Sequence, residues 1–307
     1  MDDRSIDLCA EPRCDYAIGN GNVANANYNG MVASLTKRVG DWHSLGQTFF
    51  TVAYTWSHEI DDSSGMFRNT SQVPAYNHAQ FRASGDADIR NRLAISGGWT
   101  MPFAHLFENA SKKLTDGWTL YPIITVQSGL PMDVTGGLYL DGFTPGPSGA
   151  GDQNLVKPNW AGGSSKSLNP HNYQTIALPG VLDQNGSPTS VTGNFIFDPR
   201  GLVVPACYPT QYQPNPPPCA ANTYGTLPRN FFRGPGRVNF DMALQKSTGF
   251  HDDKLQLTFR AEFFNIFNHT EFQNPTTGPA TVFSPQLGQI TSTFAPRIGQ
   301  LSLRLAF

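Results

Sequence analysis

Five charged residues alternate with hydrophobic ones in segments that otherwise have the pattern of β-strands: Arg92, Asp241, Arg260, Glu262 and Arg304. Alternate residues of a strand point to opposite faces, so these charges are predicted to share the polar face of a sheet. On a channel wall they could line the path of a ligand. They could instead pair with one another across neighbouring strands, which is ordinary sheet chemistry and is the role we favour.

The other residues that could support catalysis or metal binding form no recognisable motif. Asp61 and Asp62 are adjacent acids in a polar connection and are predicted to be solvated. The seven histidines lack metal-site spacing. GPSGAG and RGPGR lack the ending of a phosphate loop and are predicted to be turns. No serine elbow, zinc helix or nucleophilic cysteine arrangement is visible. We therefore expect a protein that is not an enzyme and has no cofactor or metal.

Two close pairs of cysteines lie in turn-rich segments, Cys9 with Cys14 and Cys207 with Cys219. Two local disulfides in an oxidising compartment are predicted, because no CxxC or nearby histidine spacing supports zinc binding. The N-terminus has neither the basic region nor the apolar stretch of a signal peptide. A membrane barrel needs such a leader, so we expect the natural protein to begin further upstream.

Composition favours strands joined by polar loops. Of the 307 residues, 14% are charged and 12% are aromatic, which argues against disorder. No apolar run approaches the roughly 18 residues that a membrane helix requires. The formal net charge of −2, without a basic stripe, argues against nucleic acid as a partner.

The last eleven residues have the period of a strand with one hydrophobic face. Leu301, Leu303, Leu305 and Phe307 fall on one side, and Gln300, Ser302 and Arg304 fall on the other. A strand facing lipid can end on an aromatic ring at the water boundary. The segment therefore predicts an outer-membrane β-barrel strand running down to its periplasmic end.

Seven segments share this alternation, and the connections between them are alternately short and long. They are residues 27–39, 47–57, 90–102, 118–129, 237–246, 254–265 and 297–307. Short turns on one side and long loops on the other are typical of outer-membrane barrels. Residues 103–117 have helical spacing and are expected to form a short surface turn. Pro122 removes one ladder hydrogen bond, so a bulge is expected there.

The hydrophobic sides of these segments are predicted to face lipid, with aromatic residues forming girdles at the water boundaries. The candidates for this lipid-facing surface and its girdles are Tyr54, Trp56, Trp99, Trp118, Phe259, Leu301, Leu303 and Phe307. Bacterial barrels have an even number of strands, so at least one upstream strand is expected to be missing. Seven strands alone are expected to form an open, curved all-β sheet with unpaired edges.

Residues 130–233 carry little strand signal and many Gly, Pro, Asn and Ser residues. They are predicted to form one long extracellular loop, which is the best candidate for contact with a ligand or a phage. The aromatic residues considered for that contact are Tyr139, Phe143, Trp160, Tyr173, Tyr208, Tyr212 and Tyr224.

Several stretches, in this order, resemble the TonB-dependent outer-membrane receptors, in particular the Oar-like group. They are YNGMVASLTKRVG, VAYTWSHEIDD, GWTLYPIITVQSGLP, NFFRGPGRVNFDMALQK, LTFRAEFFNIFNHTEF and LGQITSTFAPRIGQLSLRLAF. The resemblance implies a 22-stranded barrel around a plug, importing a ligand with energy relayed by TonB. It also implies contact with outer-membrane lipid and assembly by the barrel-assembly machinery through the C-terminal strand.

No stretch resembles the plug, the TonB-contacting box or the N-terminal regulatory-like domain of that family. Residues 1–307 are therefore expected to be the C-terminal part of a receptor barrel, with TonB acting only through a plug carried elsewhere. Two other functions remain open. A soluble secreted β-sandwich, such as an adhesin or glycan-binding module, would share the alternation but bury its apolar faces between two sheets. A passive porin would differ from a receptor in lacking a plug.

Overall fold

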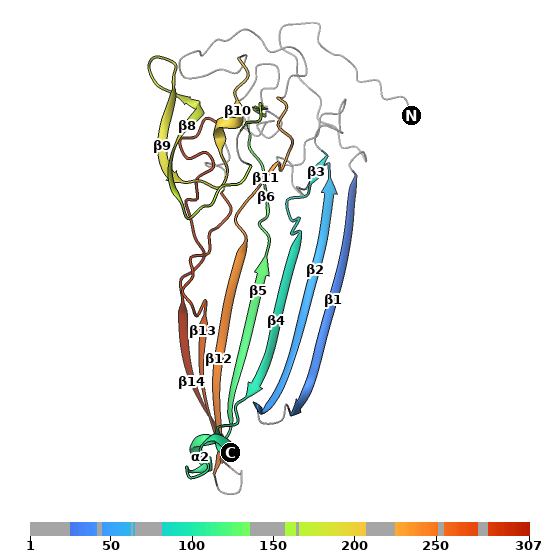
Figure 1. Cartoon of the computed structure of the whole chain (residues 1–307), viewed down its shortest axis with the longest axis vertical. Coiled ribbons are helices and arrows are strands. Elements are labelled where there is room, and N and C mark those ends of the chain that lie inside the picture. The colour runs from blue at the N-terminus through green and yellow to red at the C-terminus, as the bar shows by residue number, and fades with distance from the viewer. Residues whose placement is uncertain are drawn as a thin grey trace.

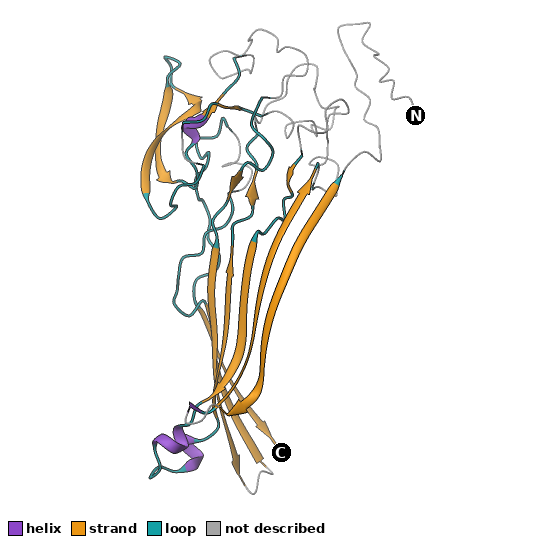
Figure 2. Ribbon diagram, turned by 45° about the vertical axis from the view of Figure 1, so that its right-hand side comes forward, coloured by secondary structure: helices purple, strands orange, loops and turns teal. Residues whose placement is uncertain are grey.

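A computed structural model describes residues 25–41, 45–62, 64, 82–135, 157–163, 166–206, 225–250, 255–275 and 282–307. Seven long strands form one antiparallel sheet in the order β1-β2-β4-β5-β12-β13-β14 (Figure 1). Their bounds are β1 Ala26–Asp41, β2 Gln47–Asp61, β4 Asn91–Thr100, β5 Trp118–Gln127, β12 Arg237–Phe250, β13 Leu255–Phe264 and β14 Ile298–Ala306. The short β3 (Ala83–Ser84) pairs with the end of β2. Within the described residues β1 and β14 are the free edges, so the predicted open, curved sheet is confirmed (Figure 2).

The connections alternate between the two ends of the sheet, as predicted. One end carries the short connections β1–β2, β4–β5 and β12–β13, and the other carries the long ones (Figure 1). We call these the short-turn end and the loop end. The β4–β5 connection contains the expected helical turn, as α1 (Phe103–Leu106) and α2 (Lys112–Thr115). No helix in the described ranges is long and apolar enough to cross a membrane.

The register carries the hydrophobic side of each strand onto the next. Directly paired residues of antiparallel strands lie on the same face. One row of pairs runs across five strands through Leu35, Val52, Ile95, Ile124 and Phe240. The row beside it, two residues along each strand, again joins hydrophobic residues, including Ala33, Tyr54, Leu93, Val126 and Val238. A slip of one residue at any pair would break this continuity. The same side continues through Leu244, Ala261 and Leu301 onto β13 and β14, so the whole sheet has one apolar face and one mainly polar face.

The bulge predicted at Pro122 is wrong. Pro122 stays opposite Met242 of β12, and the register between β4 and β5 is the same on both sides of it. The pairing between β4 and β5 is instead interrupted at Gly97 and Gly98. Proline has no backbone N–H to donate, and here its effect is limited to these pairs. Within the long-strand sheet the register shifts in β1, between Lys37 and Gly40.

The long connection between β5 and β12 is more ordered than its composition predicts. Its described parts contain β6 (Pro131–Met132), β7 (Asn159–Trp160), β8 (Tyr173–Leu182), β9 (Pro188–Asn194), the 3₁₀ helix η3 (Pro199–Gly201), β10 (Leu202–Val203) and β11 (Phe232–Arg233). The expectation of a loop with few strands is therefore wrong for these parts. Most of these elements are too short to produce a periodic pattern.

A hydrophobic core holds this connection together at the loop end. Phe197 and Phe232 stack with their ring centroids 3.9 Å apart, and Val282 from the β13–β14 connection bonds through its backbone N–H to the Thr135 carbonyl at 3.0 Å. The buried members of this loop-end core are Met132, Val134, Ile176, Leu178, Phe195, Ile196, Phe197, Leu202, Leu227, Phe232, Val282 and Leu287. Burial of so many apolar side chains fixes the loops over the end of the sheet.

Candidate functional site

The apolar face of the sheet is open to the surroundings. Leu301 and Leu303 of β14 are 71% and 69% exposed, and Leu303 lies opposite Phe259. In the described residues the other sheets are two-stranded and lie at the loop end (Figure 1), so no second sheet covers this face. Ten residues of strand extend roughly 33 Å. At the tilt of about 40° found in membrane barrels they cover roughly the 25 Å apolar band of such proteins.

All eight residues predicted to face lipid lie on this apolar face or, for Phe307, continue its alternation. Tyr54 and Trp56 lie toward the loop end, and Trp99 and Trp118 lie toward the short-turn end. The polar atoms of two of these rings have partners: the Tyr54 hydroxyl donates to Asn91 at 2.7 Å, and the Trp99 indole donates to the Leu45 carbonyl at 2.6 Å. Rings with an apolar body and a bonded polar tip suit the two membrane boundaries.

The register places the five charged candidates together on the opposite, polar face: Arg92, Asp241, Arg260, Glu262 and Arg304. The favoured ladder of opposite charges across strands is not what the structure shows. In the described part of the chain no ion pair joins Arg92, Asp241 or Arg304. Asp241 instead accepts the backbone N–H of Asn265 at 2.9 Å, which holds the chain as it leaves β13.

Arg260 and Glu262 are the two candidates that meet, and they are neighbours on the same face of β13. The Arg260 Nε donates to Glu262 at 2.5 Å, and its Nη1 donates to the Gln245 amide oxygen of β12 at 3.3 Å. The Gln300 amide of β14 donates to the other Glu262 oxygen. Amides and one ion pair thus bridge three strands, an arrangement suited to a wet wall.

A hollow on the polar face lies beside this ion pair. The Arg260 guanidinium stands 5.3 Å from the Tyr121 ring centroid, and Tyr121 meets Phe49 edge-on at 6.4 Å. Gly98 lies between these two rings, and a Cβ there would come within 2.4 Å of Phe49. The hollow has a volume of about 590 Å³ and is lined on this face by Thr36, Thr51, Ser96, Phe49, Tyr121 and Arg260. Aromatic faces beside a guanidinium and hydroxyls can contact a ligand that has both apolar and polar groups.

A cluster of charges at the loop end was not found from the sequence. We call it the loop-end cluster; it comprises Asp61, Asp86, Asp88, Arg90, Arg229 and Arg233. Asp61 and Asp62 are buried, so the prediction that they are solvated is wrong. Asp61 pairs with Arg229, and Asp62 accepts the backbone N–H of Asn25 at 2.9 Å. Asp88 and Arg90 are two residues apart, but Arg229 and Arg233 are more than 140 residues from the acids that they bond, which no local pattern reveals.

Asp88 is the centre of this cluster. Its side chain is fully buried and accepts hydrogen bonds from Arg90 at 2.7 Å and Arg233 at 2.5 Å, and from the Glu59 backbone N–H at 3.0 Å. Burial by itself would raise the pKa of Asp88, but these three hydrogen bonds outweigh it and lower the pKa from the ordinary 3.8 to about 2. The carboxylate therefore stays charged and ties the β3–β4 region to the β11 segment.

The depressed pKa of Asp88 predicts how the loop end responds to acid. Because the folded pKa lies below the ordinary one, the stabilisation is complete above pH about 4 and is lost as the pH falls toward 2. We expect it to amount to on the order of 2 kcal/mol. Hydrogen exchange of the loop-end core at pH 5 and below measures it. An Asp88→Asn variant should lose this pH step, and an unchanged step would contradict the assignment.

Neighbouring contacts extend the cluster toward the loop-end core. The Asn230 amide donates to the Ser84 carbonyl and to Asp86, both at 2.7 Å. Its backbone N–H donates to Asp133 at 3.2 Å, and the buried Lys157 pairs with that same carboxylate. Since Asn230 has a φ of 54°, an asparagine suits this position better than most residues. Hydrogen bonds thus hold the β11 segment through Asn230, which precedes the strand, and through Arg233, which ends it.

The other candidates are distributed as follows. Trp160 packs against Phe231 and Phe232 at 5.1 and 5.7 Å, a structural position, whereas Tyr173 is exposed. The remaining loop aromatics and all four cysteines lie outside the described residues. Within the described ranges no three His, Cys, Asp or Glu side chains are placed to share a metal ion.

The family model of an outer membrane beta barrel domain matches residues 17–300. No curated protein and no solved structure matches the chain.

Proposed function

Because the chain belongs to the outer membrane beta barrel domain family, we propose that it forms part of the wall of a receptor that imports a ligand with energy relayed by TonB. Membership of the family places the chain in the outer membrane. The observation that carries the proposal is the register, which puts every apolar strand side on one face and the candidate charges on the other. The TonB coupling draws on the ordered stretches that resemble Oar-like receptors.

The folded loop end favours a receptor over a passive porin. A specific ligand needs a surface that is fixed before binding, because ordering loops on binding costs affinity. The loop-end core and the loop-end cluster provide such a fixed surface over the end of the sheet (Figure 1). In this proposal the ligand first contacts the loop end and then passes the hollow beside Arg260 and Tyr121.

The proposal also assigns the partners of the chain. Outer-membrane lipid contacts the apolar face, and the barrel-assembly machinery engages the terminal strand β14. TonB acts through a plug, and no nucleic acid is involved. The proposed role is transport without catalysis, so no cofactor takes part.

A soluble β-sandwich is the weaker alternative. It requires Leu257, Phe259, Leu301 and Leu303 to pack beneath a second sheet. In the described residues no such sheet lies over them. Release of the protein from membranes by carbonate without detergent would favour the sandwich.

Nutrient uptake with and without TonB tests the proposal against a porin. Cells carrying the complete gene, in strains with and without TonB, are grown in a complex medium whose compounds are followed by mass spectrometry. We expect at least one compound to be depleted only when both the gene and TonB are present. A control strain without the gene sets the background. Depletion that depends on the gene but is equal in both strains would identify a passive porin and overturn the proposal.

A further inference from the structure

The β4–β5 connection packs on the apolar side of the sheet at the short-turn end. The Trp118 indole donates to the Leu114 carbonyl at 2.8 Å, and the Thr248 hydroxyl donates to the Lys113 carbonyl at 3.2 Å. The Lys113 ammonium lies 5.2 Å from the Phe250 ring centroid. Trp118, Thr248 and Phe250 all belong to the apolar face by their register. The helices therefore lie on the apolar side of the sheet, at its short-turn end (Figure 2).

This connection exposes large apolar side chains that the protein does not cover. Leu106 is 67% exposed, Phe107 is 58% exposed and Leu114 is 71% exposed. On the lipid side of a membrane protein, such residues can enter the acyl region next to the headgroups. Their position beside the apolar face makes lipid the partner that would bury them.

Lysines surround a hollow next to these apolar residues. The hollow has a volume of about 250 Å³, and Lys112, Lys113 and Lys246 line it together with Asp116. The Asp116 side chain accepts the Gly117 backbone N–H at 2.8 Å, and the Lys246 ammonium donates to the backbone carbonyls of Asp116 and Ser247. Three cations against one carboxylate leave an excess of positive charge. Phosphate oxygens are strong acceptors for ammonium groups.

We propose that this connection binds an anionic phospholipid of the periplasmic leaflet. The headgroup phosphate lies among Lys112, Lys113 and Lys246, and the acyl chains lie against Leu106, Phe107 and Leu114. A free phosphate ion would use the lysines alone and leave the apolar side chains without a role. The inference depends on the outer-membrane location and on short turns facing the periplasm; it is independent of TonB-driven uptake.

Lipid retention by the full chain tests the proposal. The chain, purified in detergent, is offered phosphatidylglycerol and phosphatidylcholine with the same acyl chains, and bound lipid is measured by native mass spectrometry. We expect a preference for phosphatidylglycerol that falls roughly 30-fold in the Lys112→Gln/Lys113→Gln variant, from the usual contribution of each lysine near an anionic surface. A Lys166→Gln variant at the loop end, with one charge removed, should keep the preference.

Further measurements distinguish a lipid site from a site for a free phosphate ion. A Leu106→Ser/Leu114→Ser variant keeps the lysines and should bind both lipids more weakly. Circular dichroism checks that each variant keeps its strands. In a separate experiment, inorganic phosphate competes with phosphatidylglycerol for the unaltered chain. Equal retention of the two lipids by the unaltered chain would overturn the proposal. Displacement of the lipid by millimolar inorganic phosphate would also overturn it, because it would identify a phosphate-ion site.

Discussion

An Ile124→Arg variant is expected to be largely excluded from the membrane. Ile124 lies on the apolar face in the row that also contains Ile95 and Phe240, about midway along the sheet. A cation on the lipid side of a barrel strand near the bilayer centre costs about 2–4 kcal/mol. Urea titration of the protein folded into lipid vesicles should show this loss of stability, and less of the variant should be recovered in the outer membrane of expressing cells.

Thr125→Arg is the matched control, since Thr125 is the next residue of β5 and lies on the polar face opposite Ala94 and Asn239. The same charge should there remain in water and change the unfolding free energy by less than about 1 kcal/mol. If the two variants were equally destabilised, or Thr125→Arg were the worse, the assignment of the faces would be wrong.

An Asp88→Ala variant is expected to open the loop end while leaving the sheet intact. The substitution leaves Arg233 and Arg90 without their shared carboxylate and removes the acceptor of the Glu59 backbone N–H. Removing one partner of a buried ion pair costs about 3–5 kcal/mol, and we expect the lower value because both arginines are about one-third exposed. Hydrogen exchange in the loop-end core should become roughly 100-fold faster.

Asp86→Ala serves as the control within the same cluster. The Asp86 side chain is 61% exposed, and it pairs with Arg229, which also bonds Asp61. A loss of about 1 kcal/mol or less is expected for such an exposed pair. Equal effects of the two substitutions would show that burial of Asp88 does not govern the stability of the loop end.

The sheet could be predicted from the sequence because its information is local. Each long strand alternates by itself, as Val238, Phe240, Met242 and Leu244 do in β12. Each long strand is joined to its neighbour in the sheet by a single connection, so the order of the strands in the sheet is their order in the sequence. The faces of the five charged candidates followed from the same alternation.

The loop end could not be predicted in this way. Its strands are mostly two residues long, and its core combines residues that are far apart in two connections: Val134, Phe197 and Phe232 between β5 and β12, and Val282 between β13 and β14. The pair Asp61 and Arg229 is separated by 168 residues, so nothing near either residue indicates the other. Runs of acids in HEIDD and of arginines in RNFFRGPGR were visible, but only the fold brings them together. The pairing of Arg260 with Glu262 also depended on side-chain directions that alternation does not give.

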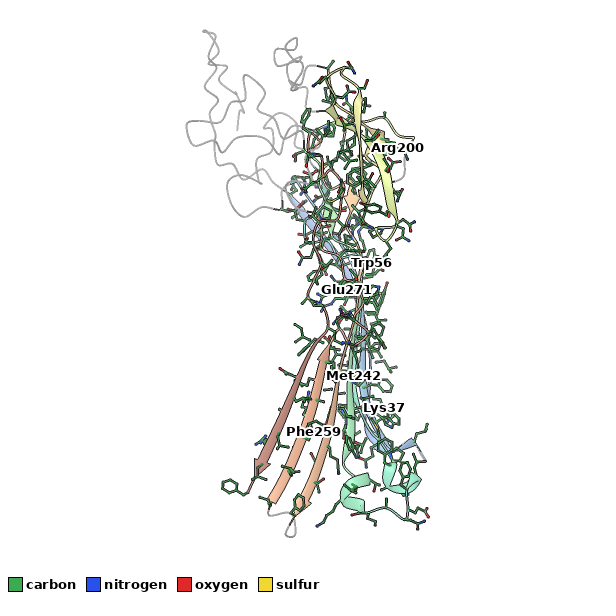
Figure 3. All side chains as sticks on the ribbon, turned by 90° about the vertical axis from the view of Figure 1, so that its left-hand side faces the viewer. Lys37, Trp56, Arg200, Met242, Phe259 and Glu271 are labelled. Carbon is green, nitrogen blue, oxygen red and sulfur yellow. The ribbon has the colours of Figure 1, made fainter. Side chains whose placement is uncertain are left out.

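The sheet and the loop end have separate structural roles. The sheet carries side chains on both of its faces, as the sticks along the strands near Met242 and Phe259 show (Figure 3). The loop end has its own core and its own ion pairs, so it can change without altering the register of the strands. Ligand specificity and membrane stability can therefore depend on different residues of one chain.

Spin-label accessibility along β12 tests the two-faced sheet most directly. Single cysteines replace successive residues from Val238 to Lys246 in a chain whose own four cysteines are serine. The labelled proteins are reconstituted in lipid and exposed to oxygen, which concentrates in lipid, and to a water-soluble nickel complex. We predict accessibilities that alternate with a period of two, with oxygen favoured at Phe240, Met242 and Leu244 and nickel favoured at Asn239, Asp241 and Gln245. Access of the nickel complex to both sets alike would contradict a wall between lipid and water.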